Sequence, residues 1–244
     1  MQESPLQEYK VHRGLCRKEV IMHNIAIDGP AGAGKSTIAR LAAEKLGFIY
    51  VDTGAMYSAM ALYFIRNGIS GDNETAVSEA CKDINVSIEY KDGEQVVILN
   101  GENVNALIRT EEVGAMASKT SIYPKVREKL TQLQRELART TDLIMDGRDI
   151  GTCVLPEAQV KIYLTASVET RGKRRFLELQ EKGISSQLDK ICEDIKARDE
   201  QDMNREISPL RQSKDAALID SSSMSIDEVT AEILRLVKGA NGWK

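Results

Sequence analysis

The chain has 244 residues, of which 42% are hydrophobic and 29% charged, which suits one large globular domain or a core with insertions. Its formal net charge of −4 argues against a nucleic-acid surface as the main partner. No apolar run approaches the roughly 18 residues needed to span a bilayer, and the first 22 residues lack the apolar segment of a signal peptide. We therefore expect a cytoplasmic protein that binds neither nucleic acid nor membrane, with its four widely spaced cysteines reduced.

Residues 1–21 are polar and aperiodic, and we expect them to form a flexible, loosely attached extension. Beyond them, apolar strands alternate with helical patterns. This alternation predicts an α/β fold in which a five-stranded parallel sheet is flanked by helices on both faces. The strands are expected at residues 24–28, 48–51, 143–146, 160–165 and 216–220, and the helices at 35–46, 55–67, 124–140, 167–182, 186–204 and 226–238.

The first predicted strand leads into a glycine-rich loop at residues 29–36, which has the pattern G-x-x-x-x-G-K-S. In such a loop, glycines let main-chain N–H groups turn towards a phosphate, while Lys35 reaches the β- and γ-phosphates and Ser36 holds Mg²⁺. The following helix directs the positive end of its dipole at the same anion. The loop therefore predicts a nucleoside triphosphate site formed by Gly29, Pro30, Ala31, Gly32, Ala33, Gly34, Lys35, Ser36 and Thr37.

One segment interrupts the alternation of strands and helices. Two short apolar runs at 86–90 and 96–99 flank Lys-Asp-Gly-Glu, which is typical of a hairpin turn. We therefore expect a small antiparallel sheet within an insertion at about residues 55–139. The phosphate-binding core is then formed by residues 22–54 and 140–240.

Three classes of protein that carry such a loop can be compared. A switch GTPase needs an N-K-x-D motif, which the chain lacks. A motor or transport ATPase usually belongs to a larger multimeric module. A small-molecule kinase needs arginines that bring two anions together, and basic residues cluster in this chain at Arg171, Lys173, Arg174 and Arg175. The distribution of arginines favours a kinase.

Five segments resemble bacterial cytidylate kinases, which are P-loop nucleoside monophosphate kinases. They read DGPAGAGKST at 28–37, DTGAMY at 52–57, DGRDIGT at 146–152, LQEKG at 179–183 and RDEQDMNR at 198–205. The resemblance covers roughly residues 22–238. It implies that the γ-phosphate of ATP is transferred to CMP or dCMP, in pyrimidine nucleotide metabolism. It also implies a monomer in which the insertion at 55–139 binds the acceptor and residues 171–186 form a short lid.

The acceptor in this reaction is a phosphate oxygen. Its second pKa lies near 6, so the group is mostly ionised at pH 7 and no general base is required. Catalysis then consists of aligning two anions and spreading the charge that develops, with Mg²⁺ as the cofactor. By resemblance, the catalytic residues are Lys35, Arg148, Arg198 and Arg205.

The resemblance also assigns binding roles to individual residues. Asp146 would hold the hydration shell of Mg²⁺ together with Ser36, and Arg148 would bind the acceptor phosphate. Asp149 would accept a hydrogen bond from the exocyclic amine of cytosine, where uracil presents a carbonyl. A mismatch there costs roughly 1–3 kcal/mol, which predicts a preference for cytosine. The acceptor site comprises Thr53, Ser118, Arg127, Arg148, Asp149, Arg198, Asp202 and Arg205.

Two groups of arginines lie at helical spacing. Arg198, Asp202 and Arg205 fall at i, i+4 and i+7 and so share one helix face. An exposed salt-bridge ladder is the structural alternative, but the resemblance favours a clamp in which Asp202 reads the sugar hydroxyls and the arginines bind phosphate oxygens. In the predicted lid, Arg174 or Arg175 would contact the adenine or the phosphates of ATP.

The residue after Tyr57 departs from the family pattern. Related sequences usually have an arginine there that touches the acceptor phosphate, whereas this chain has Ser58. A hydroxyl cannot replace a bidentate charged contact. We therefore expect either weaker acceptor binding or compensation by Arg66 or Arg109.

Two alternatives to cytidylate phosphorylation stay open. The chain could phosphorylate another small acceptor, such as UMP or a molecule that is not a nucleotide. It could also be a nucleotide-dependent binding or regulatory module that has lost transfer, although the arginines of the acceptor site argue against this.

Overall fold

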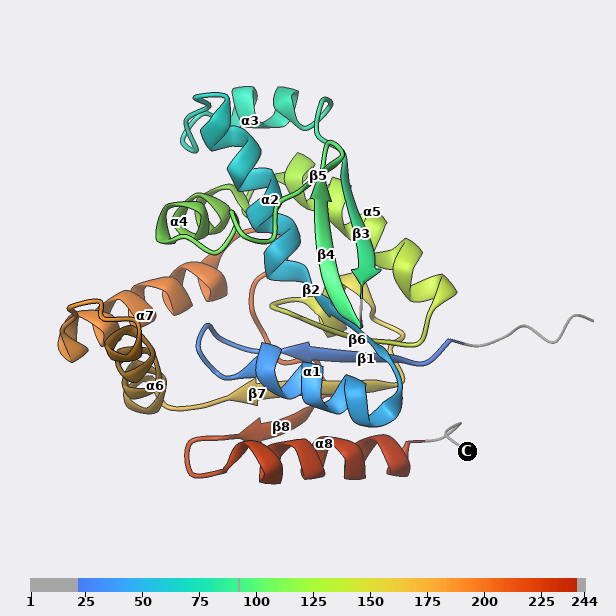
Figure 1. Cartoon of the computed structure of the whole chain (residues 1–244). Coiled ribbons are helices and arrows are strands. Elements are labelled where there is room, and N and C mark those ends of the chain that lie inside the picture. The colour runs from blue at the N-terminus through green and yellow to red at the C-terminus, as the bar shows by residue number, and fades with distance from the viewer. Residues whose placement is uncertain (1–21, 92, 241–244) are drawn as a thin grey trace, which may run out of the picture.

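A parallel sheet of five strands forms the centre of the computed structural model, which describes residues 22–91 and 93–240 (Figure 1). The strands lie in the order β2 (Ile49–Asp52), β6 (Leu143–Gly147), β1 (Asn24–Asp28), β7 (Val160–Thr165) and β8 (Ala217–Asp220), and every neighbouring pair is parallel. The predicted fold class is confirmed, and each predicted strand is placed to within one residue at either end. The predicted extension at 1–21 lies outside the described residues.

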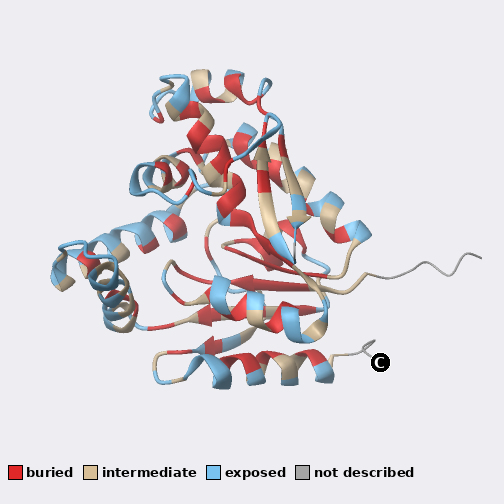
Figure 2. Cartoon of the chain, in the orientation of Figure 1, coloured by how far each residue is buried: buried red, intermediate tan, exposed pale blue. Residues whose placement is uncertain are grey.

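The central strands are apolar because helices cover both faces of the sheet. Ile25 and Ile27 of β1 point to one face, where they pack with α1 (Lys35–Leu46) and α8 (Ile226–Gly239). Ala26 points to the other face, towards the helices of the insertion. Figure 2 shows these buried strands as a continuous layer between the more exposed helices.

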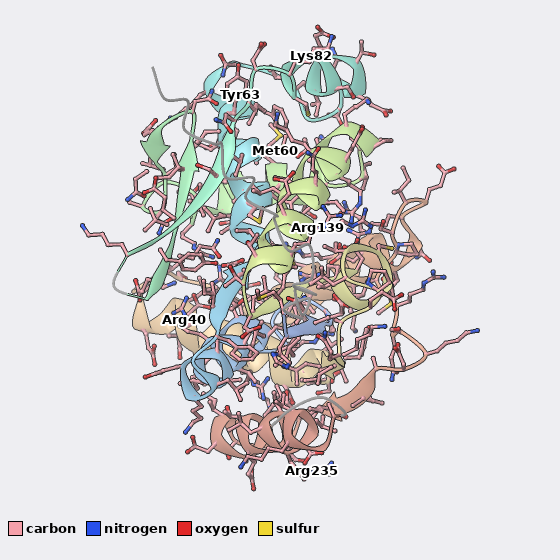
Figure 3. The ribbon with its side chains drawn as sticks, turned by 90° about the vertical axis from the view of Figure 1, so that its right-hand side faces the viewer. Arg40, Met60, Tyr63, Lys82, Arg139 and Arg235 are labelled. Atoms are coloured by element: carbon pink, nitrogen blue, oxygen red, sulfur yellow. The ribbon has the colours of Figure 1, made fainter. Side chains whose placement is uncertain are left out.

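The insertion between β2 and β6 is mostly helical. It contains α2 (Thr53–Arg66), α3 (Glu74–Ala80), β3 (Val86–Lys91), β4 (Glu94–Leu99), β5 (Glu102–Asn103), α4 (Glu111–Thr120) and α5 (Pro124–Thr140). The antiparallel hairpin β3–β4 is confirmed, whereas β5, α3 and α4 were not predicted. Met60 of α2, which is labelled in Figure 3, is fully buried within the insertion.

The chain after β6 begins with a π-helical turn, η1 (Ile150–Val154), which the sequence did not predict. Turns of this kind are rare and occur frequently at functional sites. After β7, α6 (Val168–Glu181) and α7 (Leu188–Asn204) lie side by side and project from the sheet (Figure 1). Assignment of residues 55–139 as an acceptor-binding insertion and of 171–186 as a lid stays a prediction. In the part of the chain that the structure describes, no helix has the length and apolar character of a membrane span.

The two glycines at positions 47 and 114 offer a test of the helix boundaries. Gly47 ends α1 with a φ of 69°, whereas Gly114 lies within α4, and a Cβ at either position would have no atom within 4 Å. We expect Gly47→Ala to lower the free energy of unfolding by about 1–2 kcal/mol, because an L side chain disfavours the left-handed conformation. Gly114→Ala should instead raise it by about 0.5–1 kcal/mol. Urea denaturation measures both, and changes of the same sign would contradict the assigned conformations.

Candidate active site

The loop between β1 and α1 is shaped by glycines. A Cβ at Gly29 would lie 1.9 Å from the main-chain oxygen of Leu164, so no other residue fits there. Gly34 has a φ of 89° and is the N-cap residue of α1, which begins at Lys35. The Lys35 Nζ donates a hydrogen bond to the main-chain oxygen of Pro30 at 2.8 Å. Burial, aided by the nearby Arg148, lowers the pKa of Lys35 to about 7, and a bound anion would favour its charged form.

The carboxylate of Asp146 faces this loop from the neighbouring strand β6. Its Oδ2 accepts a hydrogen bond from the Ser36 hydroxyl at 3.1 Å, and its Oδ1 accepts one from the Tyr50 hydroxyl at 2.9 Å. The Thr53 hydroxyl donates to the main-chain oxygen of Asp146 at 2.7 Å. Burial, with a smaller effect of the Asp52 charge, raises the pKa of Asp146 to about 6. The structure thus brings the predicted pair Ser36 and Asp146 together, and adds Tyr50.

Arginines and carboxylates from distant parts of the chain interlock beside Asp146. Asp149 is paired with Arg127 of α5 and, at 3.3 Å, with Arg205 at the end of α7. Asp202 accepts a hydrogen bond from Arg148 Nε at 2.8 Å and lies 4.0 Å from Arg205. Four of these five side chains are less than 10% exposed, and Arg148 is 20% exposed. This arginine–aspartate network is therefore desolvated and held in one arrangement.

A cleft of about 330 Å³ lies between the loop and the arginine–aspartate network. Arg198 lines it and forms no hydrogen bond or ion pair with any residue of the described ranges, so its guanidinium is available to a ligand. All eight predicted acceptor residues line this cleft, together with both predicted metal residues. They are Thr53, Ser118, Arg127, Arg148, Asp149, Arg198, Asp202, Arg205, Ser36 and Asp146, and Ala31, Gly32 and Lys35 of the loop join them.

A second cavity of about 430 Å³ lies on the other side of the loop. It is lined by Gly32, Ala33, Gly34, Thr37, Arg174 and Arg175, among others. Arg174 donates to the main-chain oxygen of Ser221 at 2.8 Å, while Arg175 pairs with Glu178 at 2.9 Å. Gly29 and Pro30 line neither cavity, because they lie at the base of the loop. Their roles as ATP-binding residues, and those of the two arginines, stay predictions.

Sequence reasoning missed the role of Arg171, which it had grouped with the neighbouring arginines. Its side chain points inward, donates to Asp199 at 2.6 and 3.1 Å, and donates to the main-chain oxygens of Ala31 and Ala166 at 3.0 and 2.9 Å. Arg171 thus ties the phosphate loop to α6 and α7. The sequence does place an aspartate, Asp199, next to Arg198 in the RDEQDMNR segment, and this was the available signal for a partner of Arg171. Spacing alone, however, does not give the direction of a side chain.

The two arginines that could compensate for Ser58 occupy different places. Arg109 lines the cleft beside Ser58, and its Nη2 donates to Asp52 at 2.8 Å while 63% of its side chain is exposed. Arg66 pairs with Glu102 through two hydrogen bonds of 2.5 and 3.0 Å and does not line the cleft. Of the two, Arg109 is therefore the arginine with free donors at the site.

Comparison with known proteins agrees with this geometry. A family model described as Cytidylate kinase matches residues 25–239. The cytidylate kinase of Caldicellulosiruptor bescii is 51% identical over 213 residues, covering 87% of this chain and 94% of that protein. The cytidylate kinase of Lactobacillus gasseri is 49% identical over 214 residues, covering 88% and 93%.

A solved structure of an uncharacterized protein from Eubacterium ventriosum has a TM-score of 0.50 at 12% identity, covering 89% of this chain and 99% of that one. This likeness concerns the fold alone. The family match, together with high identity to relatives that are aligned almost end to end, shows that the chain belongs to the cytidylate kinase family.

Proposed function

We propose that the protein transfers the γ-phosphate of ATP to CMP or dCMP, forming ADP and CDP or dCDP. The observation that carries this proposal is the cleft in which a phosphate loop faces a desolvated arginine–aspartate network. Two nucleotides that repel each other need fixed positive groups between them. Because every proposed residue belongs to one copy of the chain, we expect a monomer to be active.

The proposed mechanism rests on positioning and electrostatics. The loop and Lys35 hold the donor phosphates, while Arg148 and Arg205 hold the acceptor phosphate and Arg198 reaches the phosphates between them. Fixing both reactants can supply on the order of 7–11 kcal/mol of the barrier. Arginine suits this task because its planar fork binds phosphate through two donors and keeps its charge. The acceptor oxygen is already ionised, so none of the side chains needs to act as a general base.

Asp149 is proposed to read the cytosine. Arg127 and Arg205 hold its carboxylate in place, and each carboxylate oxygen retains further acceptor capacity for an exocyclic amine. The carbonyl of uracil would face these oxygens without a proton between them. Asp202, which is paired with Arg148, is proposed to read the sugar hydroxyls.

The oxygen atoms of Ser36 and Asp146 suit a magnesium ion. Hydroxyl and carboxylate oxygens are ligands that Mg²⁺ accepts, usually with waters retained in its shell. The raised pKa of Asp146 reflects a buried carboxylate whose charge a cation would stabilise. When bound, Mg²⁺ would neutralise charge on the transferred phosphate.

Asp149→Asn tests the reading of the base. We expect kcat/KM for CMP to fall about 5- to 150-fold, equivalent to about 1–3 kcal/mol. The reason is that asparagine has only one acceptor oxygen, and its amide nitrogen cannot accept a hydrogen bond from the cytosine amine. The kcat/KM for UMP should fall less. A coupled ADP-release assay with a panel of nucleoside monophosphates measures both. An equal loss for CMP and UMP would contradict the role of Asp149, and a wild type that prefers UMP would contradict the proposed function.

Ser36→Ala tests the metal site. Removing the hydroxyl should raise the Mg²⁺ concentration for half-maximal activity about tenfold, since ligand and supporting groups are worth 10- to 100-fold in metal affinity. The assay titrates Mg²⁺ at saturating nucleotide concentrations. An unchanged half-saturation point would remove Ser36 from the metal site.

Arg109→Gln and Arg66→Gln form a matched pair. The first should raise the KM for CMP about tenfold, as expected for the loss of one charge-assisted contact to phosphate. The second should leave this KM within about twofold of wild type, because Arg66 bonds Glu102 outside the cleft. Equal effects of the two substitutions would show that Arg109 does not compensate for Ser58.

A further inference from the structure

The carboxylate of Asp28 lies where the two halves of the site meet, although none of the roles above uses it. Asp28 is the last residue of β1, directly before the phosphate loop, and it is only 4% exposed. Its two oxygens accept hydrogen bonds from the main-chain N–H groups of Ile150 and Gly151, both at 2.7 Å. These are the first two residues of η1, and they directly follow Arg148 and Asp149.

The first N–H groups of a helix have no partner within the helix and need an acceptor from elsewhere. The residue that precedes η1 is Asp149, which makes no side-chain cap, because its carboxylate is paired with Arg127 and Arg205. Asp28 supplies the missing acceptors from another strand. Its cap therefore leaves the carboxylate of Asp149 free to face the cleft.

The local packing fits a short, buried contact of this kind. A Cβ at Gly151 would lie 3.2 Å from the Cδ of Lys161 and in van der Waals contact, at 3.4 Å, with Asp28 Oδ2, so the glycine leaves little free space beside the carboxylate. Burial raises the pKa of Asp28 to about 6, although the hydrogen bonds from the two main-chain N–H groups lower this pKa. With a pKa of about 6 the carboxylate is mostly ionised at pH 7, and in that form both hydrogen bonds are charge-assisted.

We propose that Asp28 is a positioning residue that caps η1 in place of Asp149, and so holds Arg148 and Asp149 in the acceptor cleft beside the phosphate loop. This inference rests on the proposed function, because it concerns how that site binds its acceptor. Since Asp28 and Gly147 are register partners on adjacent parallel strands, one side chain links the donor loop to the acceptor residues.

Asp28→Asn tests this role with little change in shape. An amide keeps one acceptor oxygen but turns an N–H₂ group towards the other main-chain N–H, so one of the two bonds is lost. We expect the KM for CMP to rise about tenfold, equivalent to about 1.4 kcal/mol, and the preference for CMP over UMP to narrow. The affinity for ATP, measured with a fluorescent ATP analogue, should stay within about twofold, because the loop keeps its glycines and Lys35.

Asp142→Asn is the matched control. The Asp142 Oδ1 accepts a hydrogen bond from the main-chain N–H of His23 at 2.6 Å, at the opposite end of strands β1 and β6. This variant makes the same chemical change at a carboxylate–main-chain contact between the residues that directly precede the same two strands. Its kinetic constants for CMP and UMP should match those of the wild type.

The outcomes separate this inference from the proposed function. A wild type that is inactive on CMP would overturn the proposed function. A wild type that is active, with an Asp28→Asn variant that keeps its KM for CMP and its CMP preference, would overturn the positioning role, whatever its Tm. A loss of ATP affinity as large as the rise in the KM for CMP would also overturn it, because Asp28 would then act on the loop.

A measurement on the wild type covers the case in which Asp28→Asn does not fold. The amide protons of Ile150 and Gly151 should exchange slowly with solvent, because a buried carboxylate accepts from both. Hydrogen exchange followed by NMR measures the two rates. Exchange as fast as in an exposed loop would overturn the cap.

Discussion

The site depends on the pairing of buried arginines with buried aspartates. A buried charge without a partner costs several kcal/mol, so Arg127 and Arg205 could not remain in the cleft without Asp149 and Asp202. The carboxylates do not cancel the positive charge, because the network holds three guanidinium groups against two carboxylates. An acidic chain, with a net charge of −4, thereby presents a positive cleft to anionic ligands.

The parallel sheet explains why residues far apart in sequence meet there. The carboxyl ends of parallel strands lie at the same edge, and ligands of such folds bind in the crevice beyond that edge. β1 leads into the phosphate loop, and its neighbour β6 leads into Arg148 and Asp149. Arg127 and Arg205 then approach from two separate helices. The sheet thus fixes the distance between the donor and acceptor halves, and the helices contribute the charges around them.

The sequence predicted the strands and the longer helices because their apolar patterns are strong and local. It did not predict η1, since a π-helical turn depends on the cap from Asp28, which is 122 residues away from Ile150. α4 was missed although Thr110 caps it and two glutamates follow, because Gly114 weakens the helical pattern. Motif segments supplied the residues of the cleft, but not the pairing of Arg127 with Asp149 or the inward direction of Arg171. Such pairings are tertiary contacts, and no local spacing encodes them.

Three neighbouring strands bring a carboxylate to the same edge of the sheet, in Asp28, Asp52 and Asp146. Each carboxylate accepts hydrogen bonds. Asp28 caps η1, whereas Asp52 caps α2 and forms an ion pair with Arg109. Asp146 accepts hydrogen bonds from the hydroxyl groups of Ser36 and Tyr50. Burial raises the pKa values of Asp28 and Asp146 to about 6, with smaller contributions from the charge of Asp149 near Asp28 and of Asp52 near Asp146. On the proposed function, a cation held by Ser36 and Asp146 would stabilise the buried carboxylate of Asp146 at the point where phosphates must also be neutralised. The burial that disfavours the charge of Asp146 therefore favours the cation that the proposed reaction requires.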